Sequence, residues 1–194
     1  MAIIGAFRFA PFAVIDIQME SGTLKLREVR MLIILGGLPG SGKSTIAQAL
    51  ARRIGACYLR ADTIEQAITS SAQADGHDVG PAGYIALYRL AADNLRLGQT
   101  VIADSVNPIE ITRAAFRNVA FETDCKFIEV EVFCSDITTH RHRAETRSPG
   151  IEGRANPTWV QIQERKYEPW FPDLRLDTFL LSVDESVAQV VKLL

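Results

Sequence analysis

Apolar residues along the chain fall into short continuous runs that alternate with runs of helical spacing. Continuous apolar runs predict strands at 32–35, 57–59, 100–103, 126–133 and 178–183. Helical spacing predicts helices at about 43–54, 63–69, 81–97, 107–121, 135–147 and 158–167, and from 184 to the C-terminus. Strands that are apolar throughout and joined by helices are typical of a parallel sheet covered on both faces. We therefore predict a three-layer α/β/α fold with a five-stranded, mainly parallel sheet.

The first 30 residues follow a different pattern. Ile15, Ile17 and Met19 alternate with polar residues, and the segment 20–23 suits a turn before a second short apolar alternation. This pattern predicts a β-hairpin. Because the first strong strand begins only at about Met31, we divide the chain into an N-terminal extension, 1–30, and a main domain, 31–194. The extension is either an added element or the product of an upstream start codon, and the sequence leaves both alternatives open.

The segment from Gly37 to Ser44 reads GLPGSGKS and matches the P-loop, or Walker A, pattern G-x-x-x-x-G-K-[ST] at every fixed position. Glycines let the backbone curl so that successive N–H groups point at phosphate oxygens, and the following helix adds the positive end of its dipole. Lys43 would contact the β- and γ-phosphates, and Ser44 would offer a hydroxyl to magnesium. A chance match has odds on the order of one in a hundred. The predicted nucleotide-binding residues here are Gly37, Leu38, Pro39, Gly40, Ser41, Gly42, Lys43, Ser44 and Thr45.

Two aspartates stand where predicted strands end. Ligands of open α/β sheets bind beyond the carboxyl ends of the strands. Asp104 closes the apolar run 100–103, where an acid beside a P-loop can hold magnesium. Asp62 follows the run 57–59, where a carboxylate can accept the proton of an attacking hydroxyl. The alternative for both is a capping role, which for Asp62 would serve a helix starting at Thr63.

Basic residues gather before a Gly- and Pro-containing segment, 148–157, that predicts a loop. Arg143 and Arg147 are four residues apart and would share one helix face, and Arg154 lies in the loop. Such arginines can stabilise the charge on a transferring phosphoryl group. The alternative is a solvated helix face. We interpret His140 and His142 as surface residues, and Trp159, Tyr167, Trp170 and Phe171 as packing in the core or at its edge.

Composition excludes some broad classes of function but does not identify one. The chain has 194 residues, of which 47% are hydrophobic and 23% charged, and its formal net charge is -2. The absence of a basic excess argues against general nucleic-acid binding. No apolar run is long enough to span a bilayer, so we expect no membrane partner. Three cysteines without metal-ligand spacing favour reduced thiols in a cytoplasmic protein.

Four segments together resemble a known family. They are the P-loop, the sequence LRAD at 59–62, the sequence VIADS at 101–105, and the pattern R-x-R-x-x-x-R that ends at Arg147. They resemble the small P-loop kinases of the AAA_33-type ATP-binding (AAA domain) family. That group is similar to the kinase part of polynucleotide kinase, to chloramphenicol phosphotransferase and to zeta toxins, and more distantly to adenylylsulfate and gluconate kinases. The resemblance covers about residues 31–194 and implies a P-loop NTPase fold.

The resemblance also implies roles for individual residues. Asp62 would be the general base, Arg143 and Arg147 would meet the ATP phosphates, and Asp104 would lie near magnesium. Relatives that act on phosphorylated acceptors often carry an arginine three residues after the base, where this chain has Glu65. A carboxylate there would repel an acceptor phosphate and suit a hydroxyl or an amine.

Taken together, these features predict a kinase that transfers the γ-phosphate of ATP, with Mg²⁺ as cofactor, to a small, non-phosphorylated hydroxyl acceptor. The predicted catalytic residues are Lys43, Asp62, Arg143 and Arg147, with Arg143 also binding nucleotide and with Ser44 and Asp104 as metal ligands. The alternative is an ATP-hydrolysing or nucleotide-sensing regulatory or toxin-like protein without a small-molecule acceptor. The sequence does not identify the acceptor or the oligomeric state.

Overall fold

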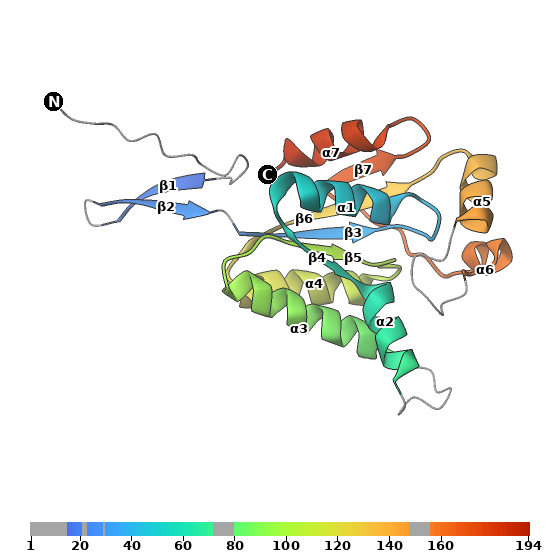
Figure 1. The fold of residues 1–194 in the computed structure, drawn as a ribbon, viewed down its shortest axis with the longest axis horizontal. Coiled ribbons are helices and arrows are strands. Elements are labelled where there is room, and N and C mark those ends of the chain that lie inside the picture. Colours follow the sequence, from blue (N-terminus) through green and yellow to red (C-terminus); the bar gives the residue numbers. More distant parts are fainter. Residues whose placement is uncertain (1–14, 21–22, 29, 72–79, 148–155) are drawn as a thin grey trace.

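The central element of the protein is a five-stranded parallel sheet (Figure 1). The computed structural model describes residues 15–20, 23–28, 30–71, 80–147 and 156–194, the first two ranges by their backbone alone. The strand order is β4-β5-β3-β6-β7. The predicted fold class, a three-layer α/β/α P-loop fold with a five-stranded sheet, is confirmed. The strands are β3 (Met31–Gly36), β4 (Cys57–Arg60), β5 (Val101–Asp104), β6 (Lys126–Phe133) and β7 (Leu174–Asp177).

Side chains of β3 alternate between two apolar layers. Ile33 and Leu35 pack with α1 (Lys43–Ile54) and α7 (Val183–Val191) on one face of the sheet. Leu32 and Ile34 pack with α3 (Ala82–Arg96) and α4 (Glu110–Glu122) on the other face. Because successive strand residues point to opposite faces, a strand covered on both faces must be apolar at every position.

Three further helices lie at the end of the sheet where the parallel strands reach their carboxyl ends (Figure 1). They are α2 (Ala61–Ser70), α5 (Ile137–Thr146) and α6 (Trp159–Gln163). The P-loop connects β3 to α1 at this same end. The fold therefore gathers the candidate chemistry at one edge of the sheet.

The predicted N-terminal hairpin is present. Strands β1 (Ile15–Glu20) and β2 (Thr23–Glu28) pair antiparallel and form a separate two-stranded sheet. The division of the chain at residue 30 stays a prediction. Within the described part of the chain, no helix combines the length and the apolar character needed to cross a bilayer.

The last strand was predicted in the wrong place. The sequence pattern puts it at 178–183, whereas β7 spans Leu174–Asp177 and the chain turns directly afterwards. The Asp177 carboxylate accepts hydrogen bonds from the backbone N–H groups of Ser135 and Phe179, both at 3.0 Å, which turns the chain away from the sheet. Ser182 then caps α7. The apolar residues of 178–183 follow the strand rather than form it, because capping and turn contacts outweigh β-propensity here.

Two predicted helix bounds also differ from the structure. Helix α4 begins at Glu110 rather than at Asn107, whose φ of 54° is left-handed. Helix α6 ends at Gln163 rather than near 167. The difference in α4 involves Arg113, whose guanidinium donates to the backbone carbonyls of Asn107 and Pro108, and also to those of Glu168 and Pro169, at 2.8–3.2 Å. Carbonyls held by this buried side chain are not available for helical hydrogen bonds.

Candidate active site

The P-loop between β3 and α1 has the backbone conformation that its glycines allow. Gly37, Gly40 and Gly42 all have positive φ, at 147°, 85° and 92°. A Cβ on Gly37 would lie 2.1 Å from the carbonyl oxygen of Val132, so space as well as conformation requires glycine there. The Gly37 N–H donates to the Val106 carbonyl at 3.0 Å, which joins the loop to the segment after β5. This conformation presents the N-terminus of α1 as an anion-binding site.

Helix α5 supports the P-loop from outside. His140 Nε2 lies 2.9 Å from the Pro39 carbonyl oxygen, and a Cβ on Gly40 would lie 3.0 Å from that of Ala144. His140 is buried, so its interpretation as a surface residue was wrong. The tertiary contact of α5 with the loop covers a side chain that the sequence pattern leaves exposed.

Arg143 is attached to the P-loop through Thr178. Its Nη1 donates to Thr178 Oγ1 at 2.9 Å, and the Thr178 hydroxyl lies 2.8 Å from the carbonyl oxygen of Ser41, to which it donates. Arg147 is the C-cap residue of α5, and its backbone N–H donates to the Arg143 carbonyl at 3.1 Å. Arg154 lies outside the described residues. The structure therefore brings Arg143 into contact with Thr178, the residue that binds the P-loop carbonyl of Ser41.

Lys43 and Asp104 form a buried ion pair. Lys43 Nζ lies 2.5 Å from Asp104 Oδ1, and the Asp104 side chain is completely buried. Its second oxygen, Oδ2, accepts a hydrogen bond from the Tyr58 hydroxyl at 2.7 Å. Burial works to raise the pKa of Asp104, but the Lys43 ammonium together with the Tyr58 and Ser44 hydroxyls outweighs it and lowers the pKa. The carboxylate therefore stays charged, and the two predicted metal ligands, Ser44 and Asp104, lie together as hard oxygen donors of the kind magnesium prefers.

Strand register places Asp62 at the same edge. Arg60, the last residue of β4, pairs with Asp104, which in turn pairs with Leu35 of β3. Asp62 lies two residues beyond Arg60, in the first turn of α2, and its carboxylate is 3.2 Å from Arg60 Nη2. The N-cap position of α2 is Arg60, so Asp62 is not the N-cap that the alternative interpretation required.

Glu65 lies one helical turn after Asp62 and faces α3. A Cβ placed on Gly83 would lie only 2.4 Å from Glu65 Cγ, so the two helices meet at this contact. Burial is the main cause of the raised pKa of Tyr84, and the nearby Glu65 carboxylate adds to it. The Tyr84 hydroxyl accepts a hydrogen bond from the Asn107 N–H at 3.1 Å. Glu65 therefore lies close to α3 and near Tyr84, whose hydroxyl contacts the segment that follows β5.

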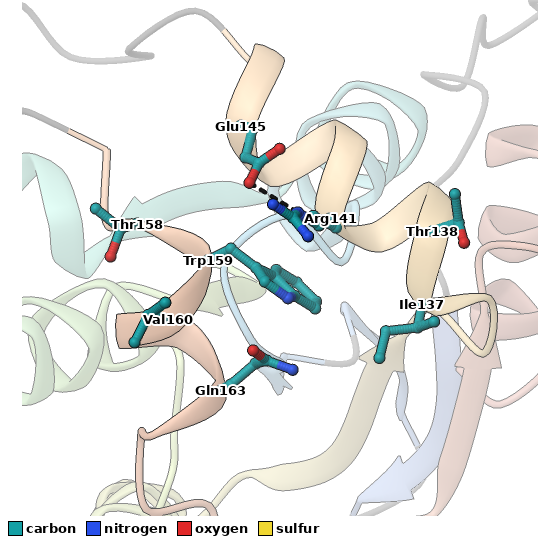
Figure 2. Close-up of a pocket in the computed structure, with 8 residues that line it drawn as sticks. All are labelled: Ile137, Thr138, Arg141, Glu145, Thr158, Trp159, Val160 and Gln163. Atoms are coloured by element: carbon teal, nitrogen blue, oxygen red, sulfur yellow. Dashed lines mark hydrogen bonds and ion pairs between the residues drawn. The ribbon is translucent and has the colours of Figure 1, made fainter.

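Two hollows adjoin helices α5 and α6. One, of about 490 Å³, includes Leu38 of the P-loop together with residues from the end of β6 and from α5 and α6. The other, of about 630 Å³, contains no P-loop residue. Figure 2 shows its lining, with Trp159 between the Arg141–Glu145 ion pair of α5 and Gln163 of α6. Because it adjoins the P-loop, the smaller hollow is the better candidate for a substrate-binding space.

The expectation that Trp159, Tyr167, Trp170 and Phe171 pack in the core or at its edge holds only in part. Trp170 is buried against Gly36 and Arg113, whereas Phe171 is 96% exposed. Trp159 packs edge-on against His140.

Sequence reasoning missed several residues that position the site. Tyr58 contacts Asp104, 46 positions away, and Thr178 contacts Arg143, 35 positions away. Arg113 contacts the Pro169 carbonyl, 56 positions away, so each of these contacts joins distant segments. The sequence carries only a weak signal for Tyr58, a polar hydroxyl within an apolar strand. No local pattern indicates the other two.

Comparison with known proteins agrees with this geometry. The model of the AAA_33 family, described as an AAA domain, matches residues 32–166. An adenylyl-sulfate kinase from Geotalea uraniireducens (strain Rf4) is 31% identical over 176 residues, which cover 84% of this chain and 79% of the relative.

Two solved structures share the fold. The Mycobacterium tuberculosis APS kinase CysC, in complex with AMPPNP and APS, has a TM-score of 0.62 at 24% identity, covering 85% of this chain and 97% of that chain. Chaetomium thermophilum Kti12, in complex with ADP-AlF3, has a TM-score of 0.63 at 24% identity, covering 83% and 95%. The P-loop geometry, the sheet order and the family match together lead to one conclusion: this chain belongs to the AAA_33 family of small P-loop kinases.

Proposed function

We propose that this protein transfers the γ-phosphate of ATP to a hydroxyl of a small, non-phosphorylated acceptor. The observation that carries the proposal is the strand register that sets Arg60 beside Asp104 and Asp104 beside Leu35. It puts a candidate base, a candidate metal ligand and the P-loop at one edge of one sheet. The 31% identity to an adenylyl-sulfate kinase supports phosphotransfer as the reaction class. We also propose that residues 31–194 form the kinase domain and residues 1–30 an extension.

In this proposal the chain's own residues divide the work of transfer. Asp62 accepts the proton of the acceptor hydroxyl, whose oxygen forms a bond to the γ-phosphorus while the bond to the β–γ bridging oxygen breaks and ADP leaves. Lys43 turns from Asp104 to the phosphates and, with Arg143, stabilises the charge that develops on the transferring group. Arg147 would join them from the end of α5.

Ser44 and Asp104 would hold magnesium, directly or through water, and the bound ion would neutralise charge on the β- and γ-phosphates. The arrangement of the pair supports this role, because a buried carboxylate kept charged beside a hydroxyl is a suitable oxygen donor set. Asp104 would then exchange one cation, the Lys43 ammonium, for another.

The carboxylate of Glu65 supports an acceptor that is not an anion. The relatives are named for adenylyl sulfate, which is an anion. In this chain a carboxylate lies one turn after the proposed base, and its repulsion of a second anion would weaken binding of such an acceptor. A neutral or amine-bearing hydroxyl compound avoids that repulsion.

The test is ADP release and transfer of γ-³²P from labelled ATP, with a panel of acceptors at fixed magnesium. The panel contains neutral polyols, amino alcohols, hydroxy-amino acids, phosphorylated sugars and adenylyl sulfate. The proposal expects labelled product with a non-phosphorylated acceptor and none with the phosphorylated sugars. ADP release that is independent of every acceptor would favour the ATPase or nucleotide-sensing alternative. Transfer to adenylyl sulfate alone would overturn the proposed acceptor class while leaving the reaction class intact.

A further inference from the structure

The two carboxylate oxygens of Asp104 have different partners, and Tyr58 is the partner of the oxygen that Lys43 does not contact. The Tyr58 hydroxyl donates to Asp104 Oδ2 at 2.7 Å, while Oδ1 receives Lys43 Nζ at 2.5 Å. In the register of β4 and β5, Tyr58 pairs with Ile102, and Asp104 lies two residues further along the same strand. Ile102 and Asp104 therefore project to the same face of the sheet. Ile102 packs in the apolar layer beneath α1, and Tyr58 packs against that layer.

Two partners of Asp104, Lys43 and Tyr58, belong to different parts of the chain. Lys43 is the P-loop lysine, and the proposed function requires it to move from Asp104 to the nucleotide phosphates. Tyr58 belongs to β4, which pairs with β5 from Cys57 to Arg60, so its hydroxyl stays where it is when Lys43 moves. A fully buried carboxylate that loses its cation depends more on the hydroxyls that remain beside it, and of these the Tyr58 hydroxyl is held by a paired strand.

We propose that Tyr58 is a positioning residue that fixes the orientation of the Asp104 carboxylate for magnesium binding. By engaging Oδ2, it keeps Oδ1 directed toward Lys43, on the side where the ion of the ATP complex would replace the ammonium. This inference rests on the nucleotide-binding part of the proposed function and does not depend on the acceptor. The phenolic hydroxyl of a tyrosine carries its proton at neutral pH, so Tyr58 can donate this hydrogen bond to the carboxylate.

The experiment removes one hydroxyl and leaves the ring. Full-length Tyr58→Phe is compared with wild type by calorimetric titration of ATP over a series of free magnesium concentrations and in EDTA. Loss of a group that orients a metal ligand typically weakens metal affinity about tenfold or more. We expect Tyr58→Phe to need about tenfold more magnesium for half-maximal strengthening of ATP binding, with binding in EDTA within about twofold of wild type.

A matched control is Tyr88→Phe. Tyr88 is a half-buried tyrosine of α3 whose hydroxyl donates to the Thr112 carbonyl at 3.3 Å, and within the described residues it has no hydrogen bond to Asp104. Its magnesium dependence should equal that of wild type. A double-mutant cycle with Asp104→Asn adds a second measurement, because removing the Tyr58 hydroxyl should change the magnesium dependence no further in that background.

Several results would overturn the inference. They are an unchanged magnesium requirement in Tyr58→Phe, an equal loss of binding with and without magnesium, or the same shift in Tyr88→Phe. An additive effect in the Asp104→Asn background would also reject it, and this comparison holds even if Tyr58→Phe lowers overall stability. Wild type that binds ATP with no dependence on magnesium would reject the inference but not phosphate binding by the P-loop. Wild type that fails to bind ATP would reject the proposed function as well.

Discussion

Lys43 Nζ lies 2.5 Å from Asp104 Oδ1, and this ion pair joins the P-loop to the end of β5 while both side chains are largely buried. The lysine proposed to bind phosphate thus also neutralises the acid proposed to bind magnesium. The ion pair contributes to the stability of the fold, whereas phosphate binding contributes to function. Variants of Lys43 and Asp104 can separate these two contributions.

Removing Lys43 should reduce stability as well as nucleotide binding. Lys43→Ala leaves the buried Asp104 carboxylate without its cation, which should lower the free energy of unfolding by about 3 kcal/mol. Urea denaturation measures this loss. The double variant Lys43→Ala/Asp104→Asn should recover most of the lost stability but not ATP binding. Equal stability of the single and double variants would contradict the pairing.

Asp62 should be needed for transfer and not for ATP binding. Asp62→Asn cannot accept a proton, so the transfer rate should fall about 100-fold or more while the Kd for ATP changes less than about twofold. Rapid-quench assays and calorimetry provide the two values. Asp93→Asn, which changes an exposed aspartate of α3, is the control for the loss of one carboxylate. Undiminished transfer by Asp62→Asn would leave Asp62 with only a structural role in α2.

Gly83 should affect the acceptor through Glu65. Alanine is favoured over glycine within a helix by about 1 kcal/mol, so Gly83→Ala alone should not weaken α3. Its Cβ would lie 2.4 Å from Glu65 Cγ and must displace that flexible side chain. We expect an increased KM for the acceptor, about threefold or more, with the KM for ATP unchanged. Steady-state kinetics would refute the assignment of Glu65 if both KM values stayed at the wild-type level.

Arg113 should be among the most sensitive positions for stability. Its side chain is fully buried, donates to four backbone carbonyls and lies with Cζ 4.8 Å from the centre of the Trp170 ring. Arg113→Met removes these donors and leaves carbonyls unsatisfied, which should cost about 3 kcal/mol or more in urea denaturation. Arg96→Met, at an exposed position of α3, should change stability by less than about 0.5 kcal/mol. Similar losses in both variants would argue against a special role for Arg113.

Thr178 should matter for nucleotide binding although it lies 137 positions after Ser41, the P-loop residue that it contacts. Thr178→Val keeps the shape but removes the hydroxyl that links Arg143 to the Ser41 carbonyl. Loss of this link should weaken ATP binding about fivefold to tenfold, consistent with one hydrogen bond to a charged group. Thr146→Val removes a hydroxyl that donates only locally within α5, to the His142 carbonyl at 2.7 Å, and should leave the Kd for ATP unchanged. Unaltered binding in Thr178→Val would show that Arg143 does not depend on this bridge.

Local sequence patterns are sufficient to predict the P-loop and the buried strands, because each of these is formed by one short segment. The P-loop depends on glycines whose backbone freedom is a property of single residues, and the buried strands depend on runs of apolar side chains. For the same reason the sequence alone places Asp104 and Asp62 at strand ends. Local patterns fail at 178–183, where capping and turn contacts make an apolar run follow a strand instead of forming it.

The remaining features of the candidate site depend on contacts between segments that are distant in the sequence. The pairing of Arg60 with Asp104, the hydrogen bond from Tyr58, and the link from Arg143 through Thr178 to Ser41 all join residues on different elements. Their side chains have no periodicity that one segment could reveal, because register and packing between elements fix which of them meet. The sequence alone therefore predicts a phosphate-binding α/β domain and its candidate acids. The residues that contact those acids and the P-loop are known only from the tertiary structure, because strand pairing and the packing of α5 against the P-loop bring them together.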